Sequence, residues 1–111
     1  INGGGTRSQR ALGIPDSPEV FEADTAKSAG SGGRPPLIKA LTHGSAPAVE
    51  WLMDAFGLDL GTVSRLAAHS HPRTHRAKDG TSSFPGMMIT YRLMEALDDI
   101  AATGDGRARV I

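Results

Sequence analysis

Proline residues restrict where helices can begin in this chain. Proline lacks the backbone N–H that a helix interior needs, but it fits the first helical position. Ser17-Pro18-Glu19 combines an N-cap serine, a first-position proline and a first-turn acid, and it predicts a helix that stops near Ala29. Pro35-Pro36 predicts the start of a second helix, and Pro85 predicts the start of the last one. The chain is therefore expected to be mainly α-helical.

The second helix carries both a disruption and a clear apolar face. Pro47 lacks the N–H that would continue the helix, and this predicts a kink or a break near residues 43–45. Beyond it, apolar residues recur at helical spacing and predict a buried face, while Trp51 projects off that face and Gly57 ends the helix. The residues of the apolar face are Val49, Leu52, Met53 and Phe56.

The last helix is apolar on two sides, which predicts neighbours on both sides. One side carries Ile89, Leu93, Leu97 and Ile100, and the other carries Met87, Tyr91 and Met94. Gly104 and Gly106 close this helix, and residues 107–111 read as the start of a strand. The fold class predicted from these patterns has three to four helices, one long basic loop and a terminal strand start.

The long basic loop spans residues 58–83, which show little regular period. It holds four Lys or Arg residues against two Asp, a net charge of +2, and three of the four histidines. Guanidinium groups bind carboxylates and phosphates through paired N–H donors, so an anion such as a pyrophosphate, a flavin edge or a dicarboxylate is one interpretation. A second is zinc bound by His69, His71 and His75, although no fourth ligand is evident. A third is structural: a solvated loop, or arginines that tie neighbouring elements together.

Composition excludes several classes of protein. The formal net charge is zero, so neither nucleic acid nor an anionic membrane is an expected partner. The chain has no cysteine, which excludes disulfides and thiolate catalysis and fits a reducing compartment. No apolar run approaches the ~20 residues of a membrane span. The glycine-rich segments 3–5 and 30–33 do not match the dinucleotide fingerprint, and no spacing of Ser, His and Asp indicates a catalytic set.

An ordered series of short segments resembles the soluble FAD-dependent fumarate reductases, in particular the yeast-type and kinetoplastid NADH-dependent enzymes within the succinate dehydrogenase and fumarate reductase flavoprotein group. The similarity covers nearly the whole chain. The segments are Ile1 to Thr6, Asp16 to Thr25, Ser45 to Leu52, Phe56 to Leu60, Ser64 to Leu66, His69-Ser70 and Pro72 to Arg76. The sequence departs from the family at Ala67-Ala68 and His71, where glycines and a small residue are typical.

The resemblance implies a flavoenzyme that reduces fumarate to succinate by hydride transfer from reduced FAD, with electrons from NADH, reduced flavin or a haem partner. It implies that this chain is an internal segment of a larger α/β FAD-binding fold, and that it is inactive alone. A cytosolic, mitochondrial or glycosome-like location would suit such an enzyme. No residue of the chain is expected to be catalytic. The expected cofactor-binding residues are Asn2, Gly3, Gly4, His69, Arg73, His75 and Arg76.

These expectations divide the chain into five segments. They are a flavin-proximal glycine-rich loop (1–16), helices (17–57), the basic loop (58–83), a helix (84–103) and a strand start (107–111). The alternative left open by the sequence is a self-contained helical protein-interaction module.

Overall fold

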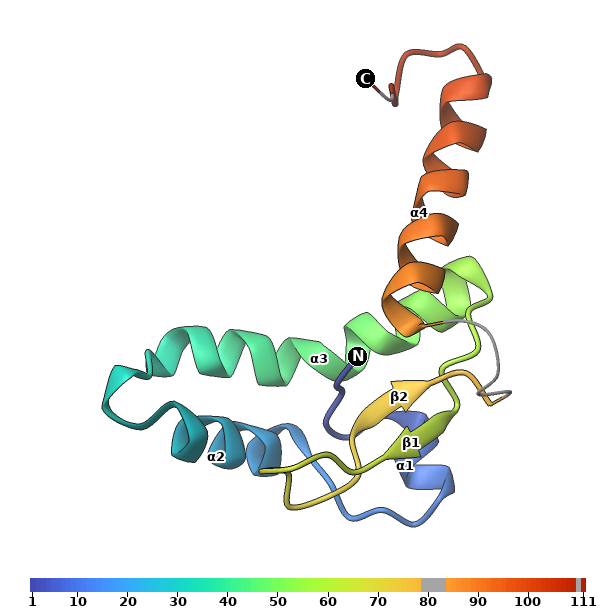
Figure 1. The fold of residues 1–111 in the computed structure, drawn as a ribbon. Coiled ribbons are helices and arrows are strands. Elements are labelled where there is room, and N and C mark those ends of the chain that lie inside the picture. Colours follow the sequence, from blue (N-terminus) through green and yellow to red (C-terminus); the bar gives the residue numbers. More distant parts are fainter. Residues whose placement is uncertain (79–83, 110) are drawn as a thin grey trace.

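The computed structural model describes residues 1–78, 84–109 and 111, and it is mostly helical (Figure 1). Four α-helices and one short 3₁₀ helix surround a two-stranded antiparallel sheet. In chain order the elements are α1 (Arg7–Ala11), α2 (Pro18–Ala29), η1 (Gly30–Gly32), α3 (Pro35–Phe56), β1 (Thr62–Ser64), β2 (Thr74–Arg76) and α4 (Pro85–Ala102).

The helix starts predicted from proline are confirmed. The Ser17 Oγ accepts a hydrogen bond from the Val20 N–H at 3.2 Å, and Pro18 is the first residue of α2. Helix α3 begins at Pro35 and ends at Gly57, whose φ of 63° is the left-handed conformation that glycine adopts without steric cost. Helix α1 was not predicted, because it lies within the segment 1–16 that was expected to be a loop.

Of the kink or break predicted near residues 43–45, the break is wrong, because α3 runs from Pro35 to Phe56 with Pro47 inside it. Proline removes one hydrogen bond of the helix. Thr42, Ser45 and Ala46 are buried before the proline, and Val49 and Leu52 are buried after it. This packing on both sides keeps the helix as one element despite the local cost.

The hydrophobic core forms where the second half of α3 meets α4 and the segment after α3. Val49 and Leu52 of the predicted face are buried with Leu58 and Leu60, and partly buried apolar residues pack around them. Those surrounding residues are Met53, Phe56, Met88, Ile89 and Leu93. Trp51 is 54% exposed, as its position off the face predicted, and its ring lies nearly perpendicular to the Phe56 ring with 4.8 Å between ring centroids.

Residues 58–78, the described part of the predicted basic loop, contain two strands that the sequence did not indicate, and residues 79–83 lie outside the described residues. Val63 of β1 pairs with His75 of β2, with Thr62 opposite Arg76 and Ser64 opposite Thr74. An isolated bridge between Asn2 and Thr74 adds the N-terminal segment to the other edge of β2. The interpretation of this segment as one irregular loop is therefore wrong for the described part, residues 58–78.

The C-terminal part differs from its prediction in two ways. Residues 107–109 and 111 contain no strand, since none of the described strands lies beside them to pair. Helix α4 packs one end against α3 and then extends away from the other elements (Figure 1), which leaves Met87, Tyr91 and Met94 at least 42% exposed. No described helix is both long enough and apolar enough to cross a membrane.

Candidate functional site

The N-terminal glycine segment lies against β2, so two groups of residues expected near the cofactor are adjacent in space. The Gly3 N–H donates to the Arg73 carbonyl at 2.9 Å, and the His75 N–H donates to the Ile1 carbonyl at 2.7 Å. The Thr74 hydroxyl donates to the Asn2 Oδ1 at 2.7 Å. At least 70 residues of sequence separate these partners, and the contacts place Asn2, Gly3 and Gly4 beside residues 73–76.

Gly3 and Gly4 are required by packing inside the chain. A Cβ on Gly3 would lie 2.8 Å from the Thr6 Cγ2 and 3.1 Å from the Val49 Cγ2, and one on Gly4 would lie 2.9 Å from the Phe21 Cβ. Both glycines are buried. Their missing side chains therefore leave room for the chain's own residues.

Arg73 is a structural residue whose side chain has no exposed surface. Its Nε and Nη2 donate to Asp16 at 3.0 and 2.8 Å, a paired geometry that suits guanidinium and carboxylate. Its Nη1 lies 2.9 Å from the Asp24 Oδ2, and its guanidinium carbon lies 4.6 Å from the centre of the Phe21 ring. Arg73 therefore fits the structural interpretation of the basic loop, in which arginines connect neighbouring elements. Its side chain is not accessible to a soluble anion.

His75 is fully buried and uses both ring nitrogens within the chain. Its Nδ1 lies 2.9 Å from the Arg73 carbonyl, which can only accept, so Nδ1 carries the hydrogen. Its Nε2 then accepts from the Thr6 hydroxyl at 2.8 Å. Burial lowers the pKa of His75, which keeps the ring neutral and maintains this pattern of donors.

Thr6 and Gln9 complete what we call the buried polar cluster, defined as Thr6, Gln9, Asp16, Arg73 and His75. The Gln9 amide nitrogen donates to the Asp16 Oδ2 and to the Pro72 carbonyl, each at 2.7 Å. Its Oε1 accepts from the Thr6 N–H at 2.9 Å, while the Thr6 hydroxyl accepts from the Gln9 N–H. Sequence reasoning missed both residues, although Thr6-x-x-Gln9 is the spacing of a capping box.

Asn2 has polar groups directed away from this cluster. The bridge to Thr74 uses the backbone groups of the neighbouring Ile1 and Gly3. Among the described residues, none forms a hydrogen bond with the Asn2 backbone N–H, its carbonyl or its side-chain nitrogen. Asn2 is only partly buried, so this edge is a place where a ligand can meet main-chain and amide groups held in fixed positions.

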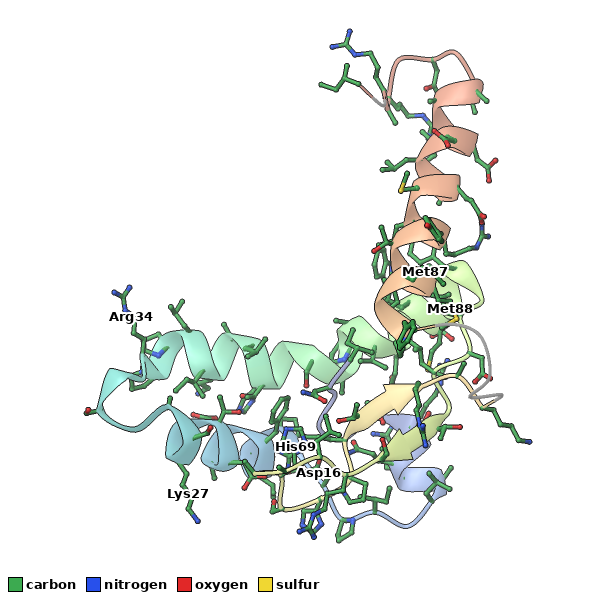
Figure 2. All side chains as sticks on the ribbon, viewed as in Figure 1. Asp16, Lys27, Arg34, His69, Met87 and Met88 are labelled. Atoms are coloured by element: carbon green, nitrogen blue, oxygen red, sulfur yellow. The ribbon has the colours of Figure 1, made fainter. Side chains whose placement is uncertain are left out.

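The other residues predicted to bind the cofactor or zinc differ in how far they are buried. His69 is partly buried, and its ring meets the Phe21 ring edge-on with centroids 6.1 Å apart. Figure 2 shows His69 and Asp16 near the same end of α2. Arg76 is exposed, and His71 is partly buried. No three His, Cys, Asp or Glu side chains of the described residues gather closely enough to hold a metal ion, so the geometry gives the zinc interpretation no support.

Comparison with known proteins gives a consistent result. Residues 1–105 match the family described as FAD binding domain. The chain is 37% identical over 111 residues to "Fumarate reductase" of Schizosaccharomyces pombe, covering 99% of this chain and 21% of that protein. It is 41% identical over 103 residues to "Fumarate reductase 1" of Saccharomyces cerevisiae, covering 93% of this chain and 22% of that protein.

A solved structure agrees with these sequences. The open conformation of a flavocytochrome c3 fumarate reductase superposes with a TM-score of 0.80 and 32% identity. The match covers 89% of this chain and 17% of that chain. The chain thus spans about a fifth of the length of the proteins that it matches.

Proposed function

The chain belongs to the FAD-binding domain family, and from this premise we propose that it forms one wall of the FAD site in an oxidoreductase that reduces fumarate to succinate. FAD supplies the hydride chemistry when bound, with NADH or reduced flavin as the electron donor. The chain supplies binding and orientation. None of its residues is assigned a catalytic role.

The observation that carries this proposal is the open polar edge at Asn2. Its backbone N–H and carbonyl point away from the pairing with Thr74, and its Oδ1 is held by the Thr74 hydroxyl. The amide nitrogen is thereby oriented with two hydrogens to donate. Such fixed donors and acceptors are suited to the polar edges of a flavin or its ribityl chain, so the residues present fit the cofactor that the family binds.

The buried polar cluster fixes the position of the backbone segment that carries Asn2. Arg73 and His75 hold the backbone of Gly3 and Ile1 through the strand pairing, and their side chains are fixed by Asp16 and Thr6. We therefore assign Arg73, His75, Gly3 and Gly4 to the positioning of the FAD-facing backbone. Asn2, His69 and Arg76 have accessible surface and are the candidates for direct contact.

A segment exchange tests the proposed function. Residues 1–111 replace the corresponding segment of the S. pombe fumarate reductase, to which they are 37% identical. The exchanged protein is expected to retain stoichiometric FAD and to oxidise a reduced dye in the presence of fumarate. A folded exchanged protein that holds FAD but reduces no fumarate would contradict the assignment to this reaction. The 111-residue chain alone is expected to show no such activity.

One observation favours a second function, a helical protein-interaction module. Met87, Tyr91 and Met94 form an exposed apolar face on α4, which is the type of surface that binds a partner helix. This alternative expects the isolated chain to unfold cooperatively and to bind a protein partner without flavin. Denaturant unfolding of the isolated chain, followed by both far-ultraviolet and tryptophan signals, compares the two, since non-coincident transitions would argue against a self-contained module.

A further inference from the structure

A hollow beside the C-terminal half of α2 has the properties of a ligand site and lies apart from the Asn2 edge. Its volume is about 440 Å³, and it is lined by Asp24, Lys27 and Ser28 of α2 together with residues 65 and 68–70. The second wall comes from the segment between β1 and β2. Two segments about 40 residues apart in the sequence therefore form one concave surface.

The charges in this hollow are unbalanced. Asp24 accepts from the Ser70 N–H and hydroxyl, each at 2.8 Å, and it lies 2.9 Å from the Arg73 guanidinium. Arg73 also pairs with Asp16, so its one positive charge is shared between two carboxylates. Lys27 and Arg65 form no ion pair with any described residue, so the hollow has two unpaired cations against one carboxylate, Asp24, which already contacts Arg73.

A polar atom at the wall is also unsatisfied. The Nδ1 of His69 is buried and has no hydrogen-bond partner among the described residues. Buried polar groups normally find a partner, and an exception calls for an explanation. His69 lines the hollow, and the ring remains neutral because burial, followed by the charge of Arg73, lowers its pKa.

The backbone at the wall is strained. Ala68 has a φ of 65°, and it is the one described non-glycine residue with a positive φ. This conformation costs an L-residue roughly 1–2 kcal/mol, and such residues gather at ligand sites and turns. A strained residue, a histidine with an unsatisfied ring nitrogen and an excess of positive charge therefore occur among the residues that line one hollow.

We propose that this hollow binds a small phosphate-type anion, with the Lys27 ammonium and the Arg65 guanidinium as its charge partners. The Ser28 hydroxyl and the His69 ring supply further hydrogen-bonding groups around it. Phosphate suits this set, since it presents several oxygens and more than one negative charge to an ammonium and a guanidinium. His69 is also a candidate for FAD contact, but the two charge partners Lys27 and Arg65 are not, so the inference can be tested independently of the proposed flavin function.

The test is titration of the 111-residue chain with inorganic pyrophosphate, followed by calorimetry and by the amide signals of residues 65–70 at constant ionic strength. Lys27→Gln and Arg65→Gln are each expected to weaken binding by about tenfold, which is the loss of one charge-assisted contact. Both side chains are exposed, so neither change should disturb the fold. Arg34→Gln is the matched control, because Arg34 is also exposed and does not line the hollow, and Figure 2 shows its side chain pointing away from α2 at the start of α3 while Lys27 points from α2 in the other direction.

Each outcome of the pyrophosphate titration either supports or overturns the proposed anion site. Saturable binding that both pocket variants weaken, and that the Arg34 variant leaves unchanged, supports it. No binding by the unaltered chain at millimolar pyrophosphate overturns it, as does an equal loss in the Arg34 variant, which would indicate diffuse attraction only. Succinate is the comparison for a dicarboxylate, and succinate binding as tight as pyrophosphate binding overturns the phosphate class. Orthophosphate and glycerol phosphate then distinguish a free anion from a phosphate ester.

Discussion

Arg73 and Asp16 form a buried two-point ion pair across 57 residues of sequence, with Nε to Oδ2 at 3.0 Å and Nη2 to Oδ1 at 2.8 Å. Neither side chain has exposed surface. This pair joins the segment before α2 to the segment before β2, and the Arg73 carbonyl in turn holds Gly3. The position of the Asn2 edge therefore depends on an interaction far from it in sequence.

Asp16→Asn is expected to destabilise the chain strongly. It removes the two-point partner of the buried Arg73 guanidinium and leaves Asp24 as its remaining carboxylate, so a loss of about 1–3 kcal/mol is expected. Urea unfolding at neutral pH measures the effect. Asp54→Asn is the control, because Asp54 pairs with Arg7 on the surface, where both side chains are exposed and solvent screens the pair. Equal shifts of the unfolding midpoint in the two variants would contradict the buried role of Asp16.

Gly3→Ala is expected to destabilise the chain by roughly 1–3 kcal/mol, as overpacking of a tight interior does. The new methyl group would meet the Thr6 Cγ2 at 2.8 Å. Thr6→Ser removes that methyl and keeps the hydroxyl, so the double variant should recover part of the loss. Gly44→Ala is the matched control: it lies inside α3 with nothing within 4 Å, and it should stabilise by about 0.5–1 kcal/mol.

Ala68→Gly is expected to stabilise the chain. Glycine removes the cost of the positive φ at this position, and after the added entropy of the unfolded chain a gain of roughly 0.5–1 kcal/mol remains. Ala67→Gly gives the comparison, since Ala67 has no positive φ and should only lose stability. Thermal unfolding of both variants measures this difference, and a loss of stability in Ala68→Gly would show that its backbone is not strained.

Stability is expected to fall as the pH is lowered through the range just below 6.5. Burial lowers the pKa of His75 from its ordinary value of 6.5, so between the lowered value and 6.5 the unfolded chain binds more protons than the folded one. Its contribution is fully present above pH 6.5 and is lost on acidification. His69 acts in the same direction, because burial and Arg73 lower its pKa as well.

Urea unfolding at pH 7.5 and at pH 5 measures this dependence. His75→Asn keeps an N–H near the Arg73 carbonyl but cannot take up a proton in this range, so it should reduce the pH dependence and leave the part due to His69. An unchanged pH dependence in His75→Asn would contradict the neutral, buried state of His75.

The sequence predicted the elements whose signals are local. Pro18 and Pro85 mark helix starts and Gly57 marks a helix end, and each acts within a few residues. The sheet was missed because its strands have three residues each and their pairing, together with the bridge from Asn2 to Thr74, is long-range. The break at Pro47 was wrongly predicted because tertiary burial outweighed a local preference.

The site was only partly predictable for the same reason. Asn2, Gly3 and Gly4 were identified through resemblance to a family, and their contact with residues 73–75 is visible only in the folded chain. Nothing near Asp16 in the sequence indicates Arg73 as its partner. Only Thr6-x-x-Gln9 offered a local signal that could have led to part of the buried polar cluster.

The most direct test of the account is the ratio of FAD to protein in the exchanged S. pombe enzyme, with and without Asn2→Asp. This change removes the free amide donor and keeps an oxygen for the Thr74 hydroxyl. The flavin absorbance of gel-filtered protein gives the ratio. We expect about one FAD per polypeptide in the exchanged enzyme, and a clearly lower ratio in a variant that remains folded. Undiminished FAD in the Asn2 variant, or a folded exchanged enzyme without flavin, would contradict the claim that this chain forms part of the FAD site.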